Sequence, residues 1–192
     1  MFYSDIILKM ILIPSTVWRV GKPNVAIRKA AVVCTIKMLD QNLIAKDKMY
    51  GSFKNLFDTL KNCIDDDWAN DIRYASVILV KTLISYLHKQ FEHEDWVLIY
   101  PELLKRLDDA QDGIRVETCK VFEIFFELLP DPWSNSLYEY TINNIFVHLD
   151  DQSTLIQEAI SNVLRKAARV QTQDFIKHAA AMTQKSAHPA LC

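Results

Sequence analysis

A short pattern that recurs along the chain constrains the fold more than any other feature of the sequence. Each copy contains an isoleucine followed by a long polar residue, at Ile27-Arg28, Ile72-Arg73, Ile114-Arg115 and Ile156-Gln157. Successive copies lie 45, 42 and 42 positions apart. A repeat of this length is typical of stacked pairs of helices. The sequence therefore predicts an array of four helical repeats.

Mostly apolar residues follow each isoleucine with the spacing of one helix face. They lie at offsets of 0, 4, 7 and 11 residues: Ile27, Ala31, Cys34, Met38; Ile72, Ser76, Leu79, Leu83; Ile114, Thr118, Val121, Phe125; Ile156, Ile160, Val163, Ala167. These offsets match the 3.6-residue period of an α-helix. Pro14 and Pro101 each stand 14 positions before the arginine of their own repeat, which supports the same register. Each repeat is therefore expected to contain two helices.

The predicted fold is an all-α, HEAT-type α-solenoid, a right-handed superhelix of antiparallel helix pairs. We expect one domain over residues 1–192, with repeats at about 1–41, 46–89, 94–130 and 134–170 and a capping helix at 172–185. The first helices are expected near 3–20, 47–63, 94–107 and 135–149, and the second near 24–40, 70–88, 112–129 and 153–169. The run Val77–Val80 favours a strand by propensity, but the helical period around it predicts a helix.

Composition and charge exclude several other classes of protein. Hydrophobic residues make up 50% of the 192 residues, enough for a packed core, whereas 3 Gly and 6 Pro are too few for the turns of a β-sandwich or barrel. The net charge of −2 lacks the basic excess of a nucleic-acid-binding protein. No stretch resembles a membrane span or a signal peptide. A soluble cytoplasmic protein is expected.

The cysteines and tryptophans do not form a ligand pattern. Cys34, Cys63, Cys119 and Cys192 are 29, 56 and 73 positions apart, without a C-x-x-C element, so reduced thiols are expected rather than a zinc site or disulfides. The four tryptophans, Trp18, Trp68, Trp96 and Trp133, lie near predicted helix ends. Because the repeat does not bring them together, we expect them to be buried in packing.

Acidic residues before the second helices predict contacts between repeats. Carboxylates at these positions lie close to the unpaired N–H groups of a helix start. The arginine one turn into the helix is then placed to reach an aspartate of its own or the neighbouring repeat. The expected inter-repeat ladder consists of Arg28, Asp66, Arg73, Asp109, Arg115 and Asp151. Gln157 replaces the arginine in the fourth repeat, where we expect the ladder to end.

No arrangement of residues predicts catalysis. Glu92-His93-Glu94 is the densest group of metal-ligand types, and HEAT-like enzymes with two irons use repeated His-Glu pairs. No such His-Glu pair accompanies the other histidines, so we interpret Glu92-His93-Glu94 as charged residues of a linker. The alternative is a metal-dependent hydroxylase centred on His93. Nucleophile-elbow, Walker and dinucleotide motifs are absent from the sequence. We therefore predict no catalytic, metal or cofactor-binding residues.

The exposed face of the second helices is the predicted protein-binding surface. Solenoids usually bind partners on an extended concave surface. Offsets of 2, 6 and 9 from the isoleucine place a mixture of apolar, aromatic and charged residues there, and the candidate residues are Lys29, Tyr74, Ile78, Lys81, Lys120, Glu123, Asn162 and Arg165. Such a mixture suits a protein partner. The alternative, strongest for Ile78, is that these side chains pack against the adjacent helix.

Longer strings in the same register resemble one protein family. They are Val17–Gly21, which leads into Ala26–Val32, the run Ile99–Asp109, and Val147–Asp151. The Leu-Asp-Asp and Ile-Arg elements are generic to HEAT repeats, whereas the run from Tyr100 to Asp109 is more specific. Together the strings resemble the C-terminal repeats of the HEAT-repeat axonemal dynein assembly factor.

The resemblance implies a non-enzymatic cytoplasmic factor that helps dynein arm subunits to assemble before their transport into cilia or flagella. The implied partners are axonemal dynein chains, chaperones and other assembly factors, without nucleic acid, membrane or cofactor. Because the family members are longer solenoids, the chain would correspond to a C-terminal fragment or a short form. A generic HEAT adaptor for another protein cargo is a further alternative.

Overall fold

All regular structure in the computed structural model is helical within the residues it describes, 2–130 and 133–183. The elements are α1 (Phe2–Ile7), the π-helical turn η1 (Leu8–Leu12), α2 (Ile13–Thr16), α3 (Lys22–Asp40), α4 (Lys46–Ile64), α5 (Asn70–Leu87), α6 (His93–Leu107), α7 (Asp112–Leu128), α8 (Asn135–Phe146), the 3-10 turn η2 (Val147–Asp150), α9 (Thr154–Val170) and α10 (Thr172–Thr183). The segment Val77–Val80 lies within α5, so the surrounding helical period correctly overrides its strand propensity.

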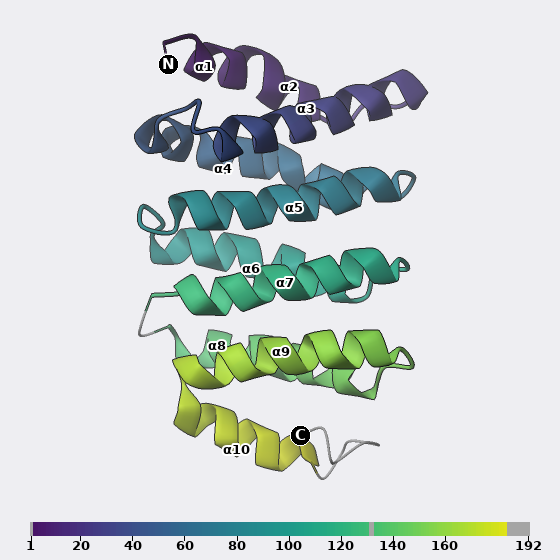
Figure 1. The fold of residues 1–192 in the computed structure, drawn as a ribbon, viewed down its shortest axis with the longest axis vertical. Coiled ribbons are helices and arrows are strands. Elements are labelled where there is room, and N and C mark those ends of the chain that lie inside the picture. Colours follow the sequence, from purple (N-terminus) through teal and green to yellow (C-terminus); the bar gives the residue numbers. More distant parts are fainter. Residues whose placement is uncertain (1, 131–132, 184–192) are drawn as a thin grey trace. The chain divides into compact units, whose positions relative to one another are not determined.

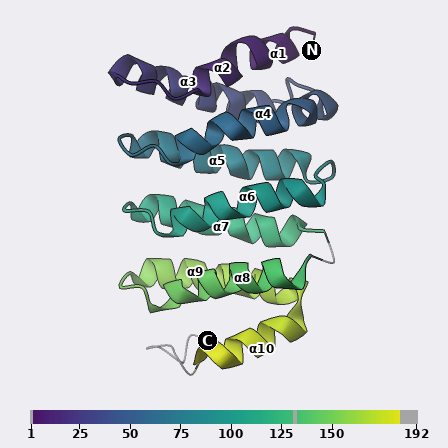
Figure 2. The same ribbon diagram turned by 180° about the vertical axis from the view of Figure 1, so that it is seen from behind.

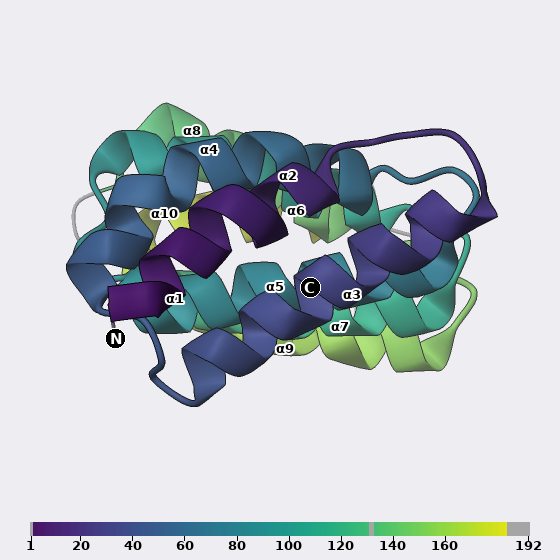
Figure 3. The same ribbon diagram turned by 90° about the horizontal axis from the view of Figure 1, so that it is seen from above.

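The chain separates into two compact units, an N-terminal unit (Met1–Trp96) and a C-terminal unit (Val97–Cys192). In the N-terminal unit, α2 and α4 form one layer, α3 and α5 form the other, and α1 runs obliquely between the two layers (Figures 1, 2 and 3). Helix α5 packs against both α3 and α4, and α2 packs against both α3 and α4. The unit is thus built from helix pairs that stack on one another.

The C-terminal unit repeats this arrangement. Helices α7 and α9 pack side by side, and α8 packs against α9 from the opposite layer (Figures 1 and 2). Helix α10 packs on both α8 and α9, where the rings of Phe146 and Phe175 lie 5.6 Å apart. The all-α, solenoid-type fold predicted from the repeat is confirmed. A single domain over residues 1–192 stays a prediction.

Aromatic side chains fill the core of each unit. In the N-terminal unit, the ring of Phe91 lies 4.7 Å from that of Phe53 and meets Trp96 edge-on at 5.4 Å. In the C-terminal unit, Phe125 meets Trp133 edge-on at 5.6 Å. Such edge-on contacts favour the ring quadrupoles and bury large apolar areas. The phenol of Tyr138 is also buried, and its hydroxyl donates a 2.8 Å hydrogen bond to the carbonyl oxygen of Ala167.

The predicted buried face is correct for three of the four second helices. In α5, α7 and α9 the residues at offsets 0, 4, 7 and 11 are all buried. In α3 the prediction is wrong, because Ile27 is 51% exposed and Cys34 is exposed, while Arg28, Ala31, Val32, Thr35 and Leu39 are buried. Helix α9 packs between α7 and α10, whereas α3 packs on α5 and on the short η1 and α2. These shorter elements leave Ile27 half exposed.

The first helix ends earlier than predicted. Helical structure stops at Thr16 rather than near residue 20, because Val17 is extended (ψ 131°) and Gly21 has a φ of 108°. That φ lies in a region that favours glycine, so Gly21 permits the sharp entry into α3. The π-helical turn η1 precedes Pro14, whose nitrogen cannot donate to the preceding turn. At the other end, α10 covers Thr172–Thr183, and residues 184–185 of the predicted capping helix lie outside the described residues.

Candidate protein-binding site

The candidate face in the N-terminal unit lies on α3 and α5. Lys29 extends from α3, and its Nζ lies 2.6 Å from Asp71 Oδ2 at the start of α5. The hydrogen bond from Lys29 is the main cause that lowers the pKa of the Asp71 carboxyl. Tyr74 stands one turn further along α5 and is 41% exposed. Ile78 and Lys81 are half-buried, so part of the predicted face also contributes to packing.

The candidate face in the C-terminal unit lies on α7 and α9 and is more polar. Lys120 is exposed, and its Nζ lies 3.0 Å from Oε2 of Glu117, a buried carboxylate. Glu123 is half-buried, one turn further along α7. On α9, Arg165 Nη1 donates to Asn162 Oδ1 at 2.7 Å, and both residues are exposed. This part of the face offers both signs of charge and an amide to a partner.

These side chains suit binding rather than bond chemistry. Lys29, Lys120 and the pair Asn162–Arg165 contact neighbours one helical turn away or on an adjacent helix, and such exposed pairs are easily exchanged for contacts with a partner. The N-terminal part supplies an aromatic and an apolar side chain, and the C-terminal part supplies charge. The assignment of all eight residues to one concave binding face stays a prediction.

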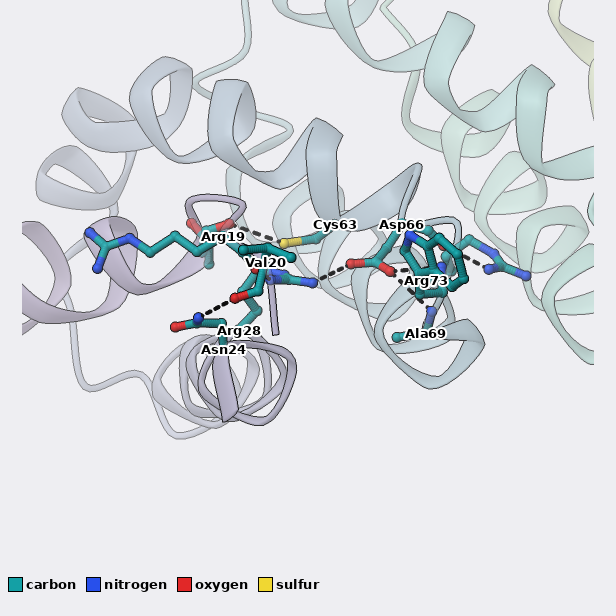
Figure 4. Close-up of polar contacts among 10 residues, drawn as sticks. Arg19, Val20, Asn24, Arg28, Cys63, Asp66, Ala69 and Arg73 are labelled. Atoms are coloured by element: carbon teal, nitrogen blue, oxygen red, sulfur yellow. Dashed lines mark hydrogen bonds and ion pairs between the residues drawn. The ribbon is translucent and has the colours of Figure 1, made fainter. Parts of the chain in front are cut away.

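In the N-terminal unit, a buried ion pair joins the first repeat to the second (Figure 4). Arg28 Nη2 lies 2.5 Å from Asp66 Oδ2, and the two side chains are 2% and 0% exposed. Arg28 Nη1 also donates to the carbonyl oxygen of Arg19 at 2.9 Å. Asp66 Oδ1 accepts from the backbone N–H groups of Trp68 and Ala69, so this carboxylate also satisfies donors at the start of α5. One aspartate thus connects two repeats and a helix start.

The C-terminal unit contains the corresponding contact between Arg115 and Asp151. Arg115 Nη2 pairs with Asp151 Oδ2, and its Nε donates to the carbonyl oxygen of Leu107 at 2.8 Å. Burial alone would raise the pKa of the Asp151 carboxyl, but hydrogen bonds from Arg115 and the Ser153 amide outweigh it and lower the pKa. Gln157 Nε2 donates to the carbonyl oxygen of Asp151 at 2.7 Å. Gln157 therefore makes a backbone contact even though it lacks the guanidinium of the other repeats.

The remaining ladder residues, Arg73 and Asp109, make hydrogen bonds within their own units. Arg73 Nη1 donates to the carbonyl oxygen of Asp66 at 2.7 Å, as Gln157 does to that of Asp151. Asp109 accepts from Arg106 Nη1 at 3.0 Å and from the backbone N–H of Gln111 at 3.0 Å. Arg73 belongs to the N-terminal unit and Asp109 to the C-terminal unit, so a continuous ladder through all repeats stays a prediction.

The metal-ligand residue types singled out in the sequence form no metal site in the part of the chain that the structure describes. Within residues 2–130 and 133–183, no group of three or more His, Cys, Asp or Glu side chains is arranged to hold a metal ion, and Glu92, His93 and Glu94 are exposed. Cys34, Cys63 and Cys119 are free thiols, and Cys192 lies outside the described residues. Burial raises the pKa of the Cys63 and Cys119 thiols to about 12. In the described part of the chain, no helix is long and apolar enough to cross a membrane.

Two tryptophans are more exposed than the sequence analysis predicts. Trp96 and Trp133 are buried, as expected, but Trp18 is 49% and Trp68 is 86% exposed. Both exposed tryptophans lie in turns that precede second helices, outside the helices whose faces pack into the core. Trp18 stands three positions before Gly21, and Trp68 directly follows the acidic run Asp65–Asp67, and these neighbours are the signal in the sequence that both residues occupy turns.

Proteins that share one curated name are similar to nearly the whole chain. Dynein axonemal assembly factor 5 from Xenopus laevis is 27% identical over 194 residues, which cover 99% of this chain. The proteins of that name from Homo sapiens and Mus musculus are 25% and 23% identical over the same share. The chain spans 23% of the length of each of these relatives. No protein-family profile matches it. The chain is thus similar to the axonemal dynein assembly factors, and the resemblance that its motifs predict is confirmed.

Proposed function

We propose that the chain is a non-enzymatic protein-binding scaffold that assists the cytoplasmic preassembly of axonemal dynein arms for motile cilia or flagella. The observation that carries this proposal is the similarity of 99% of the chain to proteins named dynein axonemal assembly factor 5. The stacked helix pairs support it, because arrays of this kind present long surfaces to protein partners. Axonemal dynein chains and chaperones or other assembly factors are the proposed partners.

The proposed mechanism is to hold partly assembled subunits on the exposed face of the second helices. Within the N-terminal unit, Lys29, Tyr74, Ile78 and Lys81 would contact the partner, with Tyr74 as an aromatic anchor. Within the C-terminal unit, Lys120, Glu123, Asn162 and Arg165 would contribute charge complementarity. The buried pair of Arg28 and Asp66 supports the rigidity that such a surface requires, because it fixes the start of α5 against α3.

Affinity capture from the cytoplasm of cells that are assembling cilia tests the proposal. The chain is compared with a variant that carries Tyr74→Ala and Lys81→Glu, and bound proteins are identified by mass spectrometry. We expect dynein arm chains on the unmodified protein and at least about tenfold less on the variant, as loss of an aromatic anchor predicts.

A matched control carries Lys54→Glu and Asn55→Ala, two exposed residues of α4 in the opposite layer. It should retain binding, because the change in charge is the same but the face is different. Capture of other cargo without dynein arm chains would contradict the proposed function and favour a generic adaptor.

A further inference from the structure

The two exposed tryptophans of the N-terminal unit border the same pocket. This pocket has a volume of about 420 Å³. Its lining includes Trp18, Val20, Lys22, Val25, Arg28 and Trp68. Trp18 and Val20 belong to the turn between α2 and α3, and Trp68 belongs to the turn between α4 and α5. We call it the Trp18/Trp68 pocket. It lies at the ends of the helices, whereas the candidate face on α3 and α5 lies along them.

Hydrogen bonds hold the first of these turns in place (Figure 4). The side chain of Asn24 donates from Nδ2 to the carbonyl oxygen of Val20 at 2.7 Å. The backbone N–H of Asn24 donates to the carbonyl oxygen of Gly21 at 3.0 Å. Arg28 Nη1 donates to the carbonyl oxygen of Arg19 at 2.9 Å. The side chains of Trp18 and Val20 are therefore presented from a backbone that is already ordered.

The second turn is held by Asp66 and is joined to the first through Arg28. Asp66 Oδ1 accepts from the backbone N–H groups of Trp68 at 3.1 Å and Ala69 at 3.0 Å, and its Oδ2 accepts from Arg28. A single guanidinium thus contacts both turns, and it also lines the pocket. A pocket whose walls are fixed before binding loses less entropy when a ligand enters.

The turn itself does not need a tryptophan at position 68. In the C-terminal unit, the backbone N–H groups of Gln111 and Ser153 donate the same type of hydrogen bond to Asp109 and Asp151, at 3.0 and 2.8 Å. A polar side chain at this position is therefore compatible with the turn. Trp68, by contrast, exposes 86% of its surface to water. Tryptophan is enriched among the few residues that carry most of the binding energy of protein–protein contacts.

The charge of the pocket selects the kind of partner. Arg19 and Lys22 line it together with Arg28, whose charge is balanced by Asp66, and the described lining residues include no acidic side chain. An acidic segment complements this charge, and an apolar side chain complements the indoles and Val20. Apart from the two indoles, the apolar side chains of Val20 and Val25 complete the wall.

We propose that the Trp18/Trp68 pocket binds a short peptide segment of a partner protein that inserts an aromatic or aliphatic side chain between the indoles and carries Asp or Glu next to it. This site is additional to the proposed scaffold face and does not depend on the identity of its cargo. Lys22 and Arg19 would attract the acidic groups, while burial of the two indoles would supply most of the affinity.

Selection from a phage-displayed library of random 12-residue peptides tests the proposal. The immobilised full chain is the target, and enriched peptides are synthesised for titrations that follow tryptophan fluorescence. We expect a consensus with one large apolar residue flanked by Asp or Glu. Binding should shift the emission to shorter wavelength, because the indoles leave water.

Point variants connect the peptides to the pocket. Trp68→Ala should weaken binding at least tenfold, and Lys22→Glu at least threefold with a smaller dependence on salt. Leu155→Ala is the matched control, because it removes an apolar side chain that is 55% exposed on α9 in the other unit. Its affinity should equal that of the unmodified chain. Far-UV circular dichroism of each variant checks that the fold is retained.

Three results would overturn the proposal: no sequence enriched over the library, a basic or uncharged consensus, or peptides that bind the Trp68→Ala variant as tightly as the unmodified chain. None of these results depends on whether dynein arm chains are captured by the candidate face. The two proposals therefore fail independently.

Discussion

Substitution of Asp66 by alanine should destabilise the N-terminal unit more than any surface change. The Asp66 side chain is fully buried and accepts hydrogen bonds from Arg28 Nη2 at 2.5 Å and from the backbone N–H groups of Trp68 and Ala69. Asp66→Ala leaves Arg28, which is 2% exposed, without its counter-charge. The guanidinium then keeps its hydrogen bond to the carbonyl oxygen of Arg19, which carries no full charge.

The expected loss follows from the burial of both partners. Removal of one member of a buried ion pair costs about 3–5 kcal/mol, because the remaining charge is uncompensated. The two amides at the start of α5 add about 1 kcal/mol, as for a lost helix cap. Asp58→Ala on α4 is the matched control, since Asp58 is 68% exposed and pairs with Lys61 at 3.3 Å. An exposed pair of this kind contributes less than about 1 kcal/mol.

Urea unfolding followed by far-UV circular dichroism measures both losses, and hydrogen exchange of peptides from α3 and α5 locates them. The double variant Arg28→Leu with Asp66→Ala should be more stable than Asp66→Ala alone, because no charge is left unpaired. A loss for Asp66→Ala as small as that for Asp58→Ala, or no recovery of stability when Arg28 is also replaced, would contradict this prediction.

Further predictions concern the C-terminal unit and the thiols. Burial lowers the pKa of His148 from its usual 6.5, and the negative charge of Asp108 offsets this only in part. As the pH falls, the unfolded chain therefore takes up a proton on His148 before the folded chain does. The free energy of unfolding should then fall as the pH drops below 6.5. His148→Gln should flatten this dependence in urea unfolding at pH 7.5 and 5.5. Tyr138→Phe removes the hydrogen bond to Ala167 and should cost about 1 kcal/mol by the same assay; an unchanged midpoint would contradict it. Iodoacetamide at pH 8 should modify Cys63 and Cys119 only after unfolding, as read by peptide mass mapping, whereas labelling of the native protein would show that they are accessible.

The sequence predicts correctly which residues are buried where several repeats share the same spacing of apolar residues. Ile72, Ile114 and Ile156 are buried because each begins a helix that packs on neighbouring helices, and one period describes all three. Ile27 has the same spacing but is half exposed. Helix α9 is covered by α7 and α10, whereas α3 is covered by α5 and by the short elements η1 and α2. Burial thus depends on neighbours in space, which a spacing along the chain does not encode.

The same spacing predicts the exposure of Tyr74 but not that of Trp68. The side chain of Tyr74 is exposed on α5, where its offset from Ile72 predicts it, whereas Trp68 lies in a turn to which helical periodicity does not apply. The turn that holds Trp68 is fixed by Asp66, which accepts hydrogen bonds from the backbone N–H groups of Trp68 and Ala69. That geometry depends on Arg28, 38 positions earlier in the chain. Contacts of this range require the three-dimensional structure.

The most direct test of the proposed function is photo-crosslinking from position 74. A photoreactive phenylalanine analogue replaces Tyr74, which is 41% exposed on α5, or Lys54 on α4 as the control, and the protein is irradiated in the cytoplasm of cells that are assembling cilia. We expect crosslinks to axonemal dynein chains from position 74 and far fewer from position 54. Equal crosslinking from both positions, or crosslinks from position 74 to proteins unrelated to dynein arms, would contradict it.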